Sequence, residues 1–244
     1  MRKSIFTFIL LASLNITANG QQQTLRPLRD LINTMDPGWA IIEGWLKTAK
    51  NDIKILPKEQ IKADSALYYT QVTSRSLMGA IIYESGGILV DNGWLRILGS
   101  GSKELNRSLP EWNKGKSFEN YGQAPAFLLI ADDVIGGMYA INGGAFGMAT
   151  RGKVYYFSPQ HLKWECINMS YSEFIHWAFH QDLNEVYEEL RWSDWKTEVK
   201  SISGNRVMFF YPFLFSAYDN IDGLNRKTVP INETWQFYMK QTKQ

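Results

Sequence analysis

The chain has 244 residues and an almost balanced charge, with 26 Lys and Arg against 24 Asp and Glu. Binding to nucleic acid through phosphate neutralisation needs a clear basic excess, so this composition argues against a nucleic-acid partner. Cys166 is the only cysteine, so no intramolecular disulfide can stabilise the fold. Stability must therefore come from a sizeable core, which nine Trp, twelve Tyr and thirteen Phe can supply.

The first twenty residues are typical of a secretory signal peptide. Arg2 and Lys3 form a basic start, residues 5–14 are apolar, and Ala18-Asn19-Gly20 offers a small-residue cleavage site. The apolar run is interrupted from Asn15 on, before it reaches the roughly 20 residues that a membrane span needs. We therefore expect cleavage after Gly20 and a periplasmic or secreted protein without a stable membrane anchor.

After cleavage, a polar spacer at residues 21–24 is expected to precede a single domain over residues 25–244. The domain begins with predicted helices. One covers residues 25–34, and a second follows Asp36, which is suited to an N-cap, and Pro37, which is suited to the first helical turn.

A first strand-rich stretch follows, in which residues 78–83, 88–90 and 94–98 are predicted strands separated by glycine-containing turns. The next connection, over residues 99–123, is polar and long for a compact domain. It is therefore either a functional loop or an insertion. Within it, Ser108-x-x-Glu111 has the spacing of a capping box.

A second stretch begins with a predicted hairpin over residues 127–141, where an apolar run meets an Asp132-Asp133 pair and a Gly136-Gly137 turn. Strands over residues 154–157 and 164–167 are expected to continue the meander.

Helices and one further strand complete the chain. Ser170-x-x-Glu173 again has capping-box spacing, and helices are also predicted after Asp182 and Ser193. A strand is expected over residues 207–215 and a last helix over residues 232–240. The expected fold class is α+β, a mostly antiparallel central sheet with helices packed on one side and at both ends.

Several segments resemble those of known bacterial families. The succession of strand, acidic-glycine turn, strand, the segment GKVYYF and a helix opening with SYSEF resembles the SUKH superfamily of cell-wall-assembly regulators and toxin-immunity proteins. The segments LRPLRDLINT, DNGWLRILGSG, FLLIADDVIGGMYAINGGAFG, LRWSDW and FYPFLF are similar to those of DUF2625, a family of unknown function. The first resemblance implies a SUKH-like scaffold that binds other proteins through its sheet and cleft.

Three acidic residues, Asp132, Asp133 and Glu84, are candidates for acid-base chemistry or cation binding. Adjacent strand residues point to opposite faces, however, so Asp132 and Asp133 cannot easily serve one site. The simpler interpretation is that one Asp caps the turn through backbone amides while the other is solvated.

Other residues of catalytic type give weaker signals. His176 and His180 have the spacing of a metalloprotease helix, but Trp177 stands where that motif needs Glu, so we expect no metal site. No motif indicates a cofactor. Cys166 with His161 would suit thiol chemistry, yet strand alternation predicts an inward-facing, inert thiol.

Aromatic and arginine side chains favour a binding surface, because these residue types dominate protein-binding hot spots. The candidates are Trp94, Arg96, Tyr139, Tyr155, Arg191 and Trp192. The alternative is that the Trp residues belong to the core and the Arg residues are solvated.

Together these observations favour an exported binding module without catalytic activity, of immunity or envelope-associated type, with a protein partner in the envelope. The signal peptide departs from the cytoplasmic address usual for toxin-immunity members. The alternative is a hydrolase or carbohydrate-binding protein acting on envelope polymers, with the acidic candidates as catalysts and Trp94 and Tyr139 as a stacking platform. Two carboxylates about 5 to 10 Å apart in a cleft would favour that alternative.

Overall fold

The protein is described by a computed structural model over residues 25–242. The expected signal peptide at residues 1–20 and the spacer at residues 21–24 lie outside the described residues. Within the described part, no helix is both long and apolar enough to cross a membrane.

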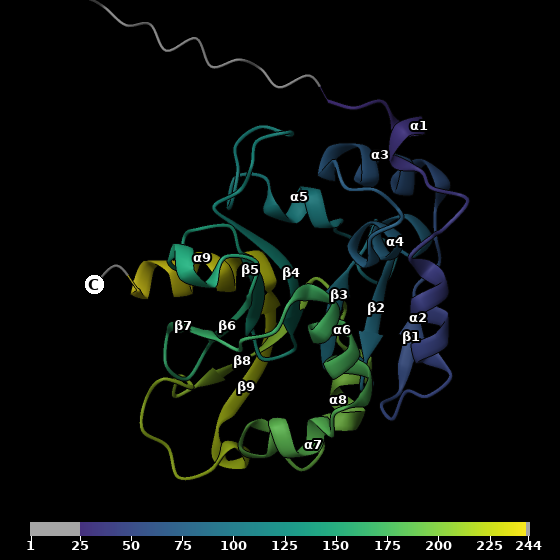
Figure 1. Ribbon diagram of the computed structural model, residues 1–244. Coiled ribbons are helices and arrows are strands. Elements are labelled where there is room, and N and C mark those ends of the chain that lie inside the picture. Colours follow the sequence, from purple (N-terminus) through teal and green to yellow (C-terminus); the bar gives the residue numbers. More distant parts are fainter. Residues whose placement is uncertain (1–24, 243–244) are drawn as a thin grey trace, which may run out of the picture.

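Seven strands within residues 25–242 form one antiparallel sheet, and their order in the sheet is their order along the chain (Figure 1). This is a continuous meander, the simplest way to connect antiparallel strands. The strands are β1 (Ile53–Ile55), β2 (Gly87–Val90), β3 (Leu95–Leu98), β4 (Phe127–Asp133), β5 (Met138–Asn142), β6 (Val154–Ser158) and β7 (Lys163–Cys166).

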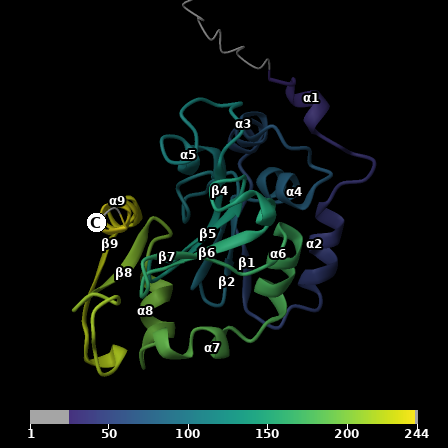
Figure 2. The same ribbon diagram turned by 60° about the vertical axis from the view of Figure 1, so that its left-hand side comes forward.

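The two faces of the sheet have different covers (Figure 2). Helices α2 (Trp39–Leu46), α4 (Leu77–Glu84) and α6 (Tyr171–His180) lie on one side. On the other side lies a hairpin of β8 (Arg206–Tyr211) and β9 (Asn225–Pro230), with α9 (Ile231–Gln241). The remaining helical segments are α1 (Leu28–Leu31), α3 (Gln60–Thr70), α5 (Leu109–Asn113), η1 (Met148–Thr150), α7 (Leu183–Val186), η2 (Glu188–Leu190), α8 (Trp195–Ser201) and η3 (Ile221–Gly223).

The α+β class and the antiparallel sheet are confirmed, and so are both predicted capping boxes. Ser170 accepts a hydrogen bond from the Glu173 amide, and the Glu173 carboxylate accepts one from the Ser170 amide. The same reciprocal pair joins Ser108 and Glu111 at the start of α5. These local signals work because each satisfies backbone donors that the first helical turn leaves free.

One predicted strand is wrong: residues 78–83 belong to α4. Ser76 caps this helix by accepting a hydrogen bond from the Gly79 amide. Ala80, Ile81 and Ile82 are all buried, so the helix is apolar on several sides and has no clear helical period. A short apolar run of this kind cannot be assigned to strand or helix by periodicity alone.

The connection over residues 99–123 has two distinct parts. Its first part is packed into the domain: Leu105, Arg107 and Leu109 are buried. The second part, from Lys114 onward, is mostly exposed or half-buried. Only the second part therefore has the exposure typical of a surface loop.

This difference predicts the order of proteolytic cleavage. Trypsin should cut after exposed Lys114 well before it cuts after Arg107, since cleavage at a buried, paired residue requires local unfolding. Mass spectrometry of the first fragments under native conditions measures this order. Early cleavage after Arg107 would contradict the packing described here.

Candidate functional site

Asp132 lies fully buried between two arginines. It stands directly across from Arg96 in the β3–β4 register, so both side chains project from the same face of the sheet. Arg96 Nη2 is 2.6 Å from Asp132 Oδ1, and Arg107 Nη2 is 2.6 Å from Asp132 Oδ2. We call Arg96, Asp132 and Arg107 the Arg–Asp–Arg cluster. The expectation that one Asp is solvated is therefore wrong for Asp132, which is 0% exposed.

The two arginines also hold the chain that enters β8. Arg96 Nη1 donates to the Arg206 carbonyl at 2.6 Å, and Arg107 Nη2 donates to the Gly204 carbonyl at 2.9 Å. Burial lowers the pKa of Arg107, while the charge of Asp132 opposes that shift. The cluster therefore acts as a structural anchor between the sheet and the hairpin layer. Its carboxylate is paired with the guanidinium groups of both arginines.

Asp133 projects to the opposite face and closes the β4–β5 turn. Its Oδ1 accepts hydrogen bonds from the Ile135 amide at 3.2 Å and the Gly137 amide at 2.7 Å. Its Oδ2 accepts one from the Tyr156 hydroxyl at 2.8 Å. The prediction that one Asp caps this turn is confirmed. Burial raises the pKa of Asp133 from 3.8 to about 6, although the bonds from Tyr156 and Gly137 act in the other direction.

The third acidic candidate stands apart from these two. Glu84 ends α4 and pairs with Lys58 at 3.3 Å. No hydrogen bond or ion pair within the described chain joins it to Asp132 or Asp133. The three candidates therefore do not form one acid-base site.

The side chains expected to form a contact surface are mostly interior. Trp94 is 0% exposed, and its ring packs 5.7 Å from Trp192 and 5.2 Å from Trp195. Arg191 pairs with Asp91 and lies over the Trp94 and Trp195 rings. The core alternative thus describes Trp94 and Trp192, but Arg191 is paired and largely covered.

The other predicted binding residues are also covered. Arg96 belongs to the Arg–Asp–Arg cluster. Tyr155 is 8% exposed and bonds to the Thr150 hydroxyl at 2.7 Å. Tyr139 is buried as well, but it contributes to the wall of a pocket. No flat surface built from the six candidates exists in the described part of the chain.

The pocket that Tyr139 reaches lies against β5, β6 and β7, between α6 and the segment from α7 to η2. Its volume is about 390 Å³, within the range of small-ligand pockets. We call it the aromatic pocket. Its lining residues are Tyr139, Tyr156, Ser158, Gln160, His161, Glu165, Ile167, Met169, Trp177, Val186, Tyr187 and Leu190.

The inner wall of the aromatic pocket is an ordered set of tyrosines. The Tyr139 and Tyr187 hydroxyls are 2.5 Å apart, and the Tyr139 and Tyr156 rings have centroids 4.8 Å apart. Burial raises the pKa of all three tyrosines, so they are neutral phenols. Because Tyr156 also bonds to Asp133, a buried carboxylate stands directly behind this wall.

The mouth of the aromatic pocket is charged and exposed. His161 Nδ1 and Glu165 Oε1 are 3.1 Å apart, and both side chains are more than half exposed. Val186, which is 42% exposed, lines the same opening. A half-buried indole, Trp177, forms the α6 side. The arrangement can hold an apolar or cationic group inside and polar groups at its edge.

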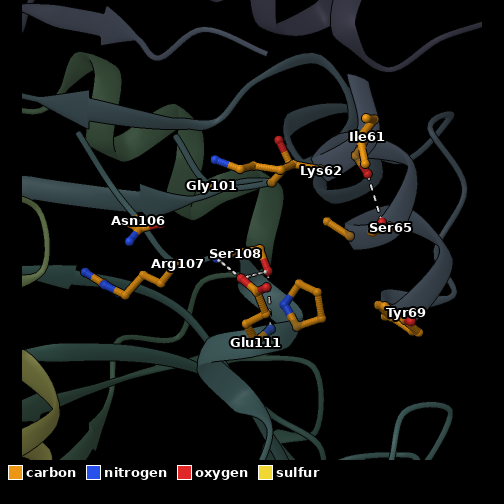
Figure 3. A pocket seen from close by; sticks show the side chains of 12 residues that line it. Ile61, Lys62, Ser65, Tyr69, Gly101, Asn106, Arg107, Ser108 and Glu111 are labelled. Atoms are coloured by element: carbon orange, nitrogen blue, oxygen red, sulfur yellow. Dashed lines mark hydrogen bonds between the residues drawn. The ribbon is translucent and has the colours of Figure 1, made fainter. Parts of the chain in front are cut away.

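A smaller cavity of about 180 Å³ lies between α3 and the segment before α5 (Figure 3). Several of its polar groups already have partners: Ser108 and Glu111 form the capping box, drawn as dashed lines, and Lys62 pairs with Glu59, outside the lining, at 2.8 Å. Arg107 extends away from Ser108 and Glu111 in Figure 3, and it is buried. The aromatic pocket is therefore the better candidate site.

The structure also locates Cys166 and the His176–His180 pair. Cys166 is exposed, so the prediction of an inward-facing thiol is wrong; β7 is the last strand of the sheet and most of its residues are exposed. His176 and His180 stack at 4.1 Å. Within residues 25–242, no three His, Cys, Asp or Glu side chains gather where they could hold a metal.

The cluster geometry predicts a large cost for losing its anion. Asp132→Asn should reduce the free energy of unfolding by about 3–5 kcal/mol, because two buried arginines lose their counter-charge. Urea denaturation measures the loss. Asp36→Asn, which breaks the exposed pair with Arg75, is the matched control and should cost about 1 kcal/mol or less. Equal effects of the two changes would contradict the anchoring role.

The position of Asp133 predicts a pH-dependent stability term. Its pKa is higher in the folded state, so the folded protein binds the proton more tightly and this contribution stabilises at low pH. The contribution is lost as pH rises from about 4 to above 6, a change of about 3 kcal/mol for a shift of this size. Asp133→Asn should remove this dependence.

Urea denaturation of the wild type and Asp133→Asn between pH 4 and pH 7 tests this term. The stability of the wild type relative to the variant should fall across that interval. Glu43→Gln, at an exposed position on α2, controls for a general loss of charge. A constant difference between wild type and Asp133→Asn at all pH values would show that Asp133 titrates normally.

Comparison with known proteins assigns the chain to a family. Residues 28–234 match the model described as Protein of unknown function DUF2625. The chain is 43% identical over 220 residues to a putative uncharacterized protein YbfG of Escherichia coli K12, covering 89% of this chain and 99% of that protein. It is also 43% identical over 190 residues to an uncharacterized protein of Haemophilus influenzae, covering 78% of this chain and 83% of that protein. No solved structure matches significantly. The chain belongs to the DUF2625 family.

Proposed function

We propose that the mature protein is an exported binding module without catalytic activity that holds a protein partner through the aromatic pocket. The observation that carries this proposal is the pocket itself: aromatic walls braced by buried hydrogen bonds, with an exposed ion pair at the mouth. Rigid aromatic rings at a concave site are typical of the centres of binding interfaces.

The state of the acidic residues weighs against the hydrolase alternative. A glycoside hydrolase needs two carboxyl groups facing each other across a cleft. Here Asp132 and Asp133 point to opposite faces and are each bound inside the protein. Among the described residues that line the aromatic pocket, Glu165 is the single carboxylate, and His161 lies 3.1 Å from it.

The kind of partner follows from two further expectations. The N-terminal segment favours export, so the partner belongs to the cell envelope or its surroundings. The SUKH-like order of strands and turns favours a protein rather than a small metabolite, of immunity or envelope-associated type. The aromatic pocket is the concave part of the sheet face on which such a contact would centre.

Capture from envelope extracts tests this function. Mature protein starting at Gln21 should retain a specific partner, and Trp177→Leu should weaken capture at least tenfold, as loss of a hot-spot aromatic costs about 2 kcal/mol. The melting temperatures of both proteins must be compared, because Trp177 also packs on Phe174.

The matched control is Trp164→Leu. Trp164 is likewise half-buried, but it lies on β7 outside the pocket lining and packs on Phe127 and Phe157. Capture should survive this change. If both variants retain the partner equally, the aromatic pocket is not the contact site. Turnover of an envelope polymer by the purified protein would refute a purely binding function.

A further inference from the structure

We propose, on the basis of the proposed function, that the occupant of the aromatic pocket is a cationic side chain, Lys or Arg, of the protein partner. The proposal rests on one arrangement, in which four aromatic rings lie beside a single exposed carboxylate. Tyr139, Tyr156, Trp177 and Tyr187 supply the rings, and Glu165 supplies the charge.

The lining chemistry selects for positive charge. Among the described residues that line the aromatic pocket, four are aromatic, one is Glu and one is His, and neither Lys nor Arg is present. The rings come from β5, β6, α6 and the residue before η2, so they approach from different directions. Aromatic faces attract ammonium and guanidinium groups, and the attraction grows when the cation is withdrawn from water.

The tyrosine hydroxyls of the pocket wall are better suited to accept hydrogen bonds from a ligand than to donate them. Tyr156 uses its proton on Asp133, so its oxygen can offer only lone pairs to a ligand. The Tyr139 and Tyr187 hydroxyls bond to each other, so one of these two hydroxyl protons is also unavailable to a ligand. Ammonium and guanidinium groups are donors only, so they complement a wall with free acceptors.

Glu165 completes the match at the mouth. It is more than half exposed, so its charge can attract a cation that enters toward the rings, while the aliphatic stem of Lys or Arg packs on Val186 at the opening. The neighbouring His161 bonds to the same carboxylate without occupying both of its oxygens. The site can therefore hold the charged head of the side chain and cover its apolar stem.

Another cavity provides an internal contrast. It measures about 500 Å³ and is lined by Arg96, Lys103 and Lys200, with Glu104 already paired to Lys54. That cavity would repel a cation. Recognition of positive charge is thus a property of the aromatic pocket, and overall charge, which is nearly balanced, would not produce it.

The test uses three blocked amino acids as probes: N-acetyl-lysine amide, N-acetyl-arginine amide and N-acetyl-norleucine amide. Norleucine has the lysine stem but lacks the ammonium group. NMR titration of the mature protein should show saturable shifts of the Trp177 indole signal with the lysine and arginine probes. Binding of the norleucine probe should be about tenfold weaker, the order expected for a partly desolvated cation–π site.

Two variants locate the binding. Trp177→Leu removes the indole signal, so binding to this variant is measured by the backbone amide signals of the other pocket residues, whose saturable shifts should be abolished. Glu165→Gln should weaken the cationic probes severalfold without affecting the norleucine probe. Glu43→Gln, exposed on α2, should change neither. Glu165 is exposed, so its variant is expected to fold normally, and the thermal unfolding curve checks this.

Several outcomes would overturn the cationic occupant. They are equal affinity for the norleucine probe, binding of the cationic probes elsewhere, or shifts of Trp177 with a chitobiose probe but with neither cation. Partner capture that depends on Trp177, without any response to the cationic probes, would refute this inference and leave the binding function standing. Capture that is independent of Trp177 would refute the function itself.

Discussion

The burial of Asp132 between Arg96 and Arg107 is the interaction on which the arrangement of layers depends. Removing three charges from water costs several kcal/mol per ion, and only close contacts with further hydrogen bonds offset that cost. Here the arginines also bind the carbonyls of Gly204 and Arg206. A carboxylate on β4 thereby fixes the start of β8, and through it the whole hairpin layer that covers one face of the sheet.

The pleat of β4 gives its last two residues different tasks. Asp132 serves the hairpin face, whereas Asp133 serves the helical face, where it closes the turn and accepts the Tyr156 hydroxyl. Position 137 must be glycine for this arrangement, since a Cβ there would lie 2.3 Å from both Asp133 Oδ2 and Tyr156 Oη. With Asp133 ionised, the two carboxylates balance the two buried arginines; protonation leaves one positive charge in excess.

Local chemistry in the sequence was enough to predict much of the fold. The Asp-Asp and Gly-Gly pairs marked the β4–β5 turn, and two Ser-x-x-Glu motifs marked the starts of α5 and α6. What failed depended on distant partners. Residues 78–83 were assigned to a strand because an apolar run of this length suits either a strand or a helix. The strand β9 was missed because its sequence, NRKTVP, has little apolar character.

The candidate site was only partly predictable for the same reason. Tyr139 and Tyr156 follow from the hairpin register, which pairs them across β5 and β6. Trp177 and Tyr187 enter the pocket from α6 and from the segment before η2, whose packing no local motif encodes. Cys166 was expected inside because strand alternation takes no account of whether anything covers the last strand of a sheet.

Some of the predicted hot-spot residues, although buried, contact the residues that line the aromatic pocket. Trp94 packs 5.3 Å from Tyr187, and Arg191 lies over both of these rings while it pairs with Asp91. Tyr187 in turn bonds to Tyr139 across the pocket wall. Trp94 and Arg191 therefore lie behind the pocket wall, where they hold the Tyr187 ring in the position in which a ligand would meet it. A rigid wall of this kind reduces the ordering cost of binding any ligand in the aromatic pocket.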